Sequence, residues 1–337
     1  MIMEAPTVYV ALSPSLAQEL ELDGQLARLE TIARVARWPG PGNPPPEVVA
    51  DALRRVRVLI TGWGTPALAP LERWTPADFA VRLVAHTAGT VKHLVPVAAI
   101  ERGLLVTHAN DSLAEAVAEF TLGAIVLARR NAFAAAARMR AGQAPLAVAS
   151  QHEVRGSTVG VIGASAIGRR VMKLLAALDV TLLLYDPYCG PAVAAEHAAE
   201  LVGLHELLRR SDIVTLHAPI TPQTIGMLGA PQFAAMTDGA LFVNTARGRL
   251  IDHDALLREL QAGRLTALLD VTDPTEPLPP ESPFFSLENC VVLPHMAATT
   301  REARQRQGRM IIDETLRFLA GEPLRYQVTR ERWDTMA

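Results

Sequence analysis

Short apolar runs alternate with helical periodicity along most of the chain. Most runs are continuously apolar, which is typical of strands buried on both faces of a sheet. Between them, stretches such as 15–30, 167–178 and 253–262 repeat apolar residues at helical spacing. This alternation predicts an α/β protein with parallel, doubly wound sheets. The predicted strands are 8–12, 56–61, 81–86, 104–107, 158–162, 180–185, 213–217, 240–244, 267–271 and 291–293.

Two features predict how this pattern divides into domains. A long helix is predicted over 113–131, opened by Ser112 with Glu115 three residues later, the spacing of a capping box. A second crossing is expected just before the helical stretch 301–319. We therefore predict a discontinuous domain, residues 1–110 plus 297–337, and a second domain, residues 111–296.

The charge balance excludes some classes of partner. With 32 Lys and Arg against 35 Asp and Glu, the net charge is −3. We therefore expect no nucleic-acid partner and no attraction to an anionic membrane. The arginines at 301, 304, 306 and 309 are interpreted as a solvated helix face in preference to an anion site.

The two cysteines, Cys189 and Cys290, offer no disulfide framework, which favours a reducing compartment. Residues 1–10 lack the basic and apolar regions of a signal peptide, and the longest apolar stretches are too short to span a bilayer. We expect a cytoplasmic protein without a metal site.

A glycine-rich turn follows the predicted strand 158–162. Gly163, Ser165 and Gly168 occupy the three positions of a dinucleotide-binding fingerprint, with serine replacing the middle glycine. The first glycine permits a tight turn, and the third permits close packing of helix on strand. Amides at the start of the helix, including those of Ala166 and Ile167, are expected to hold the pyrophosphate. Ser165 is small, and its hydroxyl is available to a phosphate.

Asp186 ends the next predicted strand, where this fold expects a ribose-binding acid. A carboxylate there accepts hydrogen bonds from ribose hydroxyls and repels a 2′-phosphate. No arginine occurs in residues 187–189, so the sequence predicts NAD in preference to NADP. The alternative is that Asp186 only supplies turn chemistry before Pro187.

Arg247, Glu276 and His295 follow successive predicted strands, at the edge of the sheet where open α/β folds bind ligands. Reduction of a 2-keto acid needs a cation for the carboxylate, a proton donor for the alkoxide and a partner for that donor. Arg247 suits the first role, His295 the second and Glu276 the third. Each residue alone also fits another role: His295 fits a structural histidine, Arg247 fits a cap of a turn and Glu276 fits a charge on a surface loop. Their joint occurrence favours catalysis.

These blocks, in this order, resemble the D-isomer-specific 2-hydroxyacid dehydrogenase family over essentially the whole chain. The matching stretches are 159–168, 216–219, 244–248, 269–271 and 294–295, and residues 270–279 resemble the hydroxypyruvate and glyoxylate reductase branch. The resemblance implies a Rossmann NAD-binding domain inserted into a discontinuous flavodoxin-like substrate domain, with the active site in the cleft between them. It implies a homodimer built largely from the cofactor domain, and interconversion of a small D-2-hydroxy acid and its 2-keto acid.

The resemblance also assigns roles to individual residues. Arg247, Glu276 and His295 match the substrate-binding arginine and the acid/base pair. The other matching positions are Asp270 for the nicotinamide carboxamide, Thr245 and Ala246 beside the nicotinamide, Ala218, Pro219 and Thr224 in a loop along the cofactor, and Ala88, Gly89 and Thr90, which with Thr87 form a turn whose amides hold the substrate carboxylate.

Four departures from the family pattern accompany this match. Besides Ser165, the path over 273–276 is one residue longer than usual, which would disable the enzyme if it moved Glu276 away from His295. Lys92 stands where relatives often carry aspartate, and residues 296–298 lack a glycine.

Trp63 follows a predicted strand of the first domain. Either it walls the substrate pocket and favours an apolar or aromatic side group, or it is an ordinary packing residue; a phosphorylated substrate would instead call for a cation there. The alternative function is a non-catalytic NAD(H)-sensing interaction protein of the corepressor type on the same fold.

Overall fold

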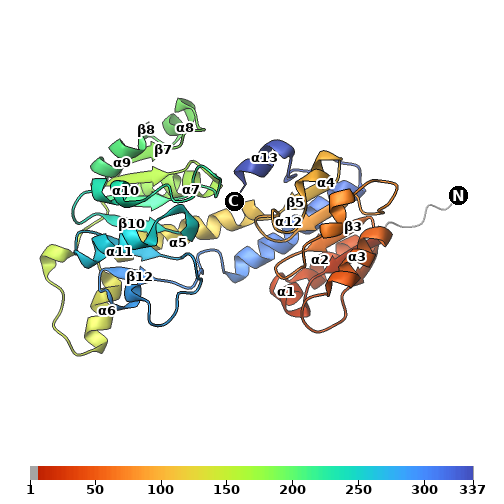
Figure 1. Cartoon of the computed structure of the whole chain (residues 1–337), viewed down its shortest axis with the longest axis horizontal. Coiled ribbons are helices and arrows are strands. Elements are labelled where there is room, and N and C mark those ends of the chain that lie inside the picture. The colour runs from red at the N-terminus through yellow and green to blue at the C-terminus, as the bar shows by residue number, and fades with distance from the viewer. Residues whose placement is uncertain (1–6, 337) are drawn as a thin grey trace. The chain divides into compact units, whose positions relative to one another are not determined.

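The computed structural model describes residues 7–336, which form two compact units (Figure 1). Unit 1 comprises the described residues of Met1–Leu113 and Thr300–Ala337, and unit 2 is Ala114–Thr299. The boundaries predicted from the sequence, after residues 110 and 296, each lie three residues earlier. The absence of a targeting signal was predicted over 1–10, of which 1–6 lie outside the described residues.

Unit 1 contains a five-stranded parallel sheet with the order β2-β1-β3-β4-β5. Buried side chains of α1, α2 and α12 cover one face, and those of α3, η1 and α4 cover the other. The elements are β1 (Thr7–Ala11), α1 (Pro14–Glu19), α2 (Leu22–Glu30), β2 (Arg34–Arg37), α3 (Pro46–Arg55), β3 (Val58–Thr61), η1 (Ala69–Arg73), β4 (Leu83–His86), α4 (Val97–Glu101), β5 (Leu105–His108), α12 (Arg301–Leu319) and α13 (Arg330–Thr335).

Unit 2 contains a seven-stranded parallel sheet with the order β12-β11-β10-β9-β6-β7-β8. Helices α9, α10 and α11 cover one face, and α5, α7 and α8 cover the other. The elements are α5 (Asn110–Arg129, begun in unit 1), α6 (Ala132–Arg140), η2 (Val148–Ser150), β6 (Thr158–Ile162), α7 (Ala166–Leu175), η3 (Ala176–Leu178), β7 (Thr181–Tyr185), α8 (Pro191–Glu196), β8 (Ala199–Leu201), α9 (Leu204–Arg210), β9 (Ile213–Leu216), α10 (Ala230–Ala235), β10 (Leu241–Asn244), η4 (Gly248–Leu250), α11 (His253–Gln261), β11 (Thr266–Leu269), η5 (Pro283–Ser286) and β12 (Cys290–Val292).

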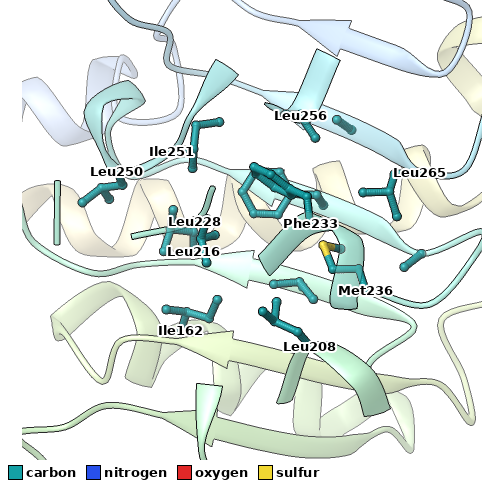
Figure 2. Packing of buried hydrophobic residues seen from close by; sticks show 14 of the residues in the cluster. Ile162, Leu208, Leu216, Leu228, Phe233, Met236, Leu250, Ile251, Leu256 and Leu265 are labelled. Atoms are coloured by element: carbon teal, nitrogen blue, oxygen red, sulfur yellow. The ribbon is translucent and has the colours of Figure 1, made fainter. Parts of the chain in front are cut away.

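The core on the α10 face of unit 2 is built around Phe233. Figure 2 shows its ring among buried side chains that include Leu256 and Met236. The ring of Phe233 meets that of Phe242 edge to face, with 5.4 Å between centroids. This packing fixes β10 and β9 under their helices, so the residues after these strands have rigid supports.

The strand order of unit 2 reverses at β6. The chain continues from β6 to β7 and β8 on one side, and then returns to β9, β10, β11 and β12 on the other. In open α/β sheets, ligands bind beyond the carboxyl ends of the strands at such a switch point. The turn after β6 and the turns after β9, β10 and β11 therefore belong to one binding edge.

The fold class predicted from the sequence is confirmed, but several local predictions were wrong. The predicted helix 15–30 is two helices, because Glu21 adopts a left-handed conformation with φ 48°. Strands β2 and β8 were missed. Both are edge strands whose residues are largely exposed, so they lack the apolar run on which strand prediction depends.

The predicted capping box is also wrong. Helix α5 begins at Asn110, so Ser112 lies inside its first turn, and its hydroxyl donates to the carbonyl of Ala109 at 2.5 Å. Glu115 instead pairs with Arg170 at 2.7 Å. The Ser-x-x-Glu pattern was present, but the helix had already started two residues earlier.

Candidate active site

The two glycines of the fingerprint are required by the geometry of the turn after β6. Gly163 has φ +100°, and a Cβ atom there would lie 2.7 Å from the amide nitrogen of Ala218. A Cβ atom at Gly168 would lie 2.0 Å from the carbonyl oxygen of Gly163. No other residue type fits either position without moving backbone. The turn is thus pressed against both β9 and α7.

Ser165 at the middle position is free of this constraint. Its backbone is extended, with φ −64° and ψ 175°, which any residue adopts. Its side chain is the N-cap of α7 and accepts a hydrogen bond from the amide of Gly168 at 3.2 Å. The hydroxyl hydrogen remains available as a donor. The replacement therefore costs no backbone strain and adds a cap to the helix that faces the expected phosphate position.

Asp186 links the end of β7 to the glycine-rich turn. One carboxylate oxygen accepts from the amide of Ala164 at 2.7 Å, and the other accepts from the amide of Tyr188 at 2.8 Å. The second bond is the local turn chemistry that the sequence left as an alternative. The first bond brings the carboxylate to the fingerprint, where a dinucleotide would meet it. These features fit an NAD-type cofactor.

Ala218, Pro219 and Thr224 form a closed loop after β9. The hydroxyl of Thr224 donates to the carbonyl of Pro219 at 2.6 Å and accepts from the amide of Thr221 at 2.8 Å. The amide of His217 donates to Ile162 at 2.7 Å, which continues the β6–β9 pairing up to this loop. The loop is therefore held beside Gly163 at the binding edge.

The turn carrying Thr245, Ala246 and Arg247 is held by Asn244, which is fully buried at the end of β10. The Asn244 side chain accepts from the amide of Ala246 and donates to the carbonyl of Arg247, both at 3.0 Å. Thr121 of α5 shares a hydrogen bond of 2.9 Å with the hydroxyl of Thr245.

The sequence analysis missed both supporting residues. A side-chain amide directly after a buried strand is the signal that would have identified Asn244. No local signal exists for Thr121, because its partner is 124 residues away.

Arg247 extends from this turn, and its Nη1 donates to the carbonyl of Ala246 at 2.7 Å. Burial lowers the pKa of Arg247 from its ordinary value, and the nearby negative charge of Glu276 opposes that shift. The guanidinium is thus a partly desolvated cation next to a carboxylate. Desolvation strengthens its attraction for an incoming anion.

Glu276 reaches His295 despite the longer path before it. The Nδ1 atom of His295 lies 2.8 Å from a carboxylate oxygen of Glu276. This contact leaves the Nε2 atom of the imidazole for a substrate. The same carboxylate acts on Arg247, so the structure brings all three predicted residues together in unit 2.

Asp270 fixes the backbone that carries His295. The Asp270 side chain is 1% exposed, and its two oxygens accept from the amides of Met296 and Ala297 at 2.8 and 2.9 Å. The amide of His295 donates to the Asp270 carbonyl at 2.9 Å, and His295 has the unusual φ of +54°. Burial raises the pKa of Asp270, while these amides and His295 oppose the rise. The segment that lacks the usual glycine is therefore anchored by an acid.

The remaining predicted residues lie in unit 1. Residues 87–90 follow β4, and the carbonyl of Ala88 accepts from the amide of Ala109 at 2.9 Å. The hydroxyl of Thr90 accepts from the amide of Lys92 at 3.4 Å. Gly89 lies so near Asn110 that a Cβ atom there would be 3.2 Å from the amide oxygen. This turn is braced by backbone and amide contacts.

Trp63 follows β3 in unit 1 and is 41% exposed. The guanidinium of Arg304, from the first turn of α12, stacks on its ring at 4.1 Å from the centroid. The interpretation of the α12 arginines as a solvated face is wrong for this residue, since the Arg304 side chain is only 17% exposed. Runs of charged residues usually lie in solvent. Only the tertiary fold brings the indole of Trp63 to Arg304.

Two structural features are absent from the described residues. Between residues 7 and 336, no helix is both long and apolar enough to cross a membrane. Within that same stretch, no group of three or more His, Cys, Asp or Glu side chains is arranged to hold a metal ion.

Comparison with known proteins identifies what the chain is similar to. A model of the D-isomer specific 2-hydroxyacid dehydrogenase NAD binding domain matches residues 122–297. D-3-phosphoglycerate dehydrogenase of Methanocaldococcus jannaschii is 38% identical over 227 residues, which cover 67% of this chain and 43% of that protein. Glyoxylate reductase of Korarchaeum cryptofilum is 30% identical over 302 residues, 88% of this chain and 90% of that protein.

Among solved structures, apo D-mandelate dehydrogenase of Rhodotorula graminis matches with a TM-score of 0.83, covering 97% of this chain and 98% of that one. Its 23% identity makes this a likeness of fold alone. This chain spans less than half the length of the phosphoglycerate dehydrogenase that it matches.

Proposed function

Because this chain belongs to the D-isomer-specific 2-hydroxyacid dehydrogenase family, we propose that it interconverts a small D-2-hydroxy acid and its 2-keto acid with NAD as the cofactor. The observation that carries the proposal is the pairing of His295 with Glu276 at 2.8 Å, beside the partly buried Arg247. The three residues lie at the carboxyl edge of a sheet that also presents the dinucleotide fingerprint.

Each of the three residues has a role in keto-acid reduction. NADH, when bound, supplies the hydride that reaches C2. Arg247 binds the substrate carboxylate through its planar guanidinium and polarises the carbonyl oxygen. His295 gives the proton on Nε2 to the oxygen that becomes the hydroxyl, and takes it back in the reverse direction. Glu276 holds the ring through Nδ1 and stabilises its charged form.

The cofactor proposal rests on the turn after β6. The cap at Ser165 and the amides of Ala166, Ile167 and Gly168 suit the pyrophosphate, and Asp186 suits the ribose hydroxyls over a 2′-phosphate. Thr245 and Ala246 would lie beside the nicotinamide. Asp270 would hold its carboxamide with oxygen lone pairs that the amides of residues 296 and 297 leave free.

The substrate proposal uses unit 1 as well. The turn with Ala88, Gly89 and Thr90 would hold the substrate carboxylate by backbone amides, as the family resemblance implies. Trp63 would contact the side group of the acid. The resemblance of residues 270–279 makes glyoxylate and hydroxypyruvate the first acids to test.

We also propose a homodimer formed mainly through unit 2, in the cytoplasm. Met139 of α6 is 66% exposed and Val148 is 86% exposed, and a partner subunit would cover these apolar side chains. Both cysteines, Cys189 and Cys290, are free, which suits a reducing compartment. A monomeric mass by light scattering at micromolar concentration would contradict the dimer.

The activity is tested by NADH oxidation with a panel of 2-keto acids. His295→Ala is compared with wild type and with His205→Ala, an exposed histidine of α9 that serves as the matched control. We expect turnover of at least one acid, lost by about 10²-fold or more in His295→Ala only. Tight NADH binding without turnover of any acid would contradict the enzyme and favour the NAD(H)-sensing alternative.

A further inference from the structure

The carboxyl edge of the unit 1 sheet carries a cation that the proposed reaction does not use. Arg304 lies over the Trp63 ring, with its guanidinium carbon 4.1 Å from the ring centroid. Its Nη1 donates to the side-chain oxygen of Gln307, one turn along α12, at 3.1 Å. Gln307 is fully buried, so it cannot swing away from this position. The Arg304 guanidinium is thus held both by an aromatic face and by a fixed amide.

Most donors of this guanidinium lack a protein partner. Among the described residues, the Arg304 side chain makes a single hydrogen bond, and its buried Nε atom makes none. Glu19 of α1 lies 3.5 Å from Nε, but this carboxylate is 56% exposed and its charge is screened by water. Burial lowers the pKa of Arg304, and Glu19 opposes that shift. The side chain therefore remains a partly desolvated cation with donors to spare.

The loop that carries Trp63 lies beside the turn proposed to hold the substrate carboxylate, since a Cβ atom at Gly62 would be 2.5 Å from the hydroxyl of Thr87. Strands β3 and β4 end in step, because Thr61 pairs with His86 and the amide of Thr87 donates to Thr61 at 2.7 Å. Two residues beyond these strand ends stand Trp63 and Ala88. Neighbouring parallel strands lie about 5 Å apart, which is the length of a short acid. A molecule held at residues 88–90 would therefore lie beside the loop that carries Trp63, and Arg304 lies over the Trp63 ring.

We propose that Arg304 is a specificity-determining residue, which binds an anionic side group at the far end of a 2-keto acid substrate. This inference rests on the proposed function and names the substrate class: 2-keto acids with a second anion, a carboxylate or a phosphate, beyond C3. Trp63 supports the guanidinium from one side, and the N–H edge of the guanidinium meets two oxygens of the anion side by side. Gln307 is a positioning residue that sets the direction of this edge.

The chemistry of the pair favours an anion over an apolar group. An apolar side group placed against Arg304 would remove water from its unpaired N–H donors without replacing those hydrogen bonds, which is unfavourable. A second carboxylate or phosphate would satisfy them and outcompete the screened Glu19. Of the two roles that the sequence left open for Trp63, a wall of an apolar pocket and a packing residue, neither included the cation that lies over its ring.

The test compares four acids: glyoxylate and pyruvate, which have no distal charge, oxaloacetate with a distal carboxylate, and 3-phosphohydroxypyruvate with a distal phosphate. Steady-state kcat/KM is measured for wild type, Arg304→Gln and Arg304→Lys. Arg309→Gln is the matched control, since Arg309 is an exposed arginine on the same helix. NADH binding by fluorescence and circular dichroism are recorded for every variant.

In wild type we expect at least one distal-anion acid to have a higher kcat/KM than pyruvate, and whether it is oxaloacetate or the phosphate ester identifies the anion. Arg304→Gln should lower that kcat/KM by about 20-fold or more, the size of a charge-assisted hydrogen bond, and change the values for glyoxylate and pyruvate by less than about threefold. Arg304→Lys should retain part of the preference because it keeps the charge but loses the fork. Arg309→Gln should behave as wild type.

The following outcomes overturn the inference. One is an equal loss for all four acids in Arg304→Gln, and another is a wild-type preference for uncharged acids that Arg304→Gln leaves unchanged. If Arg304→Gln fails to fold, Arg304→Lys is used in its place. A loss of kcat/KM in Arg304→Lys that is equal for acids with and without a distal anion then overturns the inference. Turnover of pyruvate or glyoxylate alone would refute only the role of Arg304, whereas no turnover of any acid would refute the proposed function itself.

Discussion

Replacing Asp270 with asparagine should separate the support of His295 from the binding of the cofactor. In the wild type both carboxylate oxygens accept backbone amides, from Met296 at 2.8 Å and from Ala297 at 2.9 Å, in a site that is 1% exposed. Asparagine keeps one acceptor oxygen and presents an NH2 group to the other amide. Two donors then face each other without an acceptor.

The cost follows from these contacts. A hydrogen bond to a charged group contributes about 1.5–3 kcal/mol, and a buried donor left unpaired costs about 1–3 kcal/mol more. His295 holds a left-handed backbone with φ +54°, itself unfavourable by about 1 kcal/mol for a residue with a Cβ atom. We take about 3 kcal/mol as the net loss of free energy that holds residues 295–297 in the observed conformation. At 1.36 kcal/mol per tenfold, this loss corresponds to about 10²-fold in rate.

The assay measures kcat, KM and the Kd for NADH of Asp270→Asn. Asp254→Asn is the control, because this exposed carboxylate of α11 makes no hydrogen bond among the described residues. We expect kcat to fall about 10²-fold while the Kd for NADH changes less than about threefold, since asparagine still offers an oxygen to the carboxamide. A Kd that rises by the same factor as kcat/KM falls would refute the reasoning, and would show that the loss comes from the contact of Asp270 with the cofactor.

Two further predictions concern the cap of α7 and the pH dependence of stability. Ser165→Ala should lower the free energy of unfolding of unit 2 by about 1 kcal/mol and Ser165→Gly by less, as for other N-caps, measured by urea denaturation; equal stability of all three proteins would count against the cap. His217 is buried, and burial lowers its pKa from 6.5 to about 3. The pKa of His217 is lower in the folded protein than in the unfolded chain, so its neutral form stabilises the fold. This contribution is present above pH 6.5 and is lost as the pH falls towards 3. Between about pH 7.5 and about pH 5 this group should remove about 2 kcal/mol of stability. His217→Asn should lack that part of the loss, and an identical pH dependence of variant and wild type would show that His217 is not the cause.

Sequence reasoning located the candidate site because the chemistry follows strands. Each buried apolar run predicts a strand, and in a parallel sheet all the carboxyl ends meet at one edge. Arg247, Glu276 and His295 were therefore assignable to one edge before any distance was known. The observed 2.8 Å between His295 and Glu276 also removes the concern raised by the longer loop over 273–276.

The sequence by itself determined the fold class, the glycine-rich turn and the acid at Asp186, because each depends on neighbours in the chain: apolar periodicity, backbone freedom at glycine and turn chemistry. It did not show that Ser165 caps α7, since capping depends on where the helix begins, nor that Asp270 anchors residues 296 and 297. The stacking of Arg304 on Trp63 joins residues 241 positions apart. Contacts of this kind carry no local signal, because they arise only when packing brings distant segments together, and so only the tertiary structure decided them.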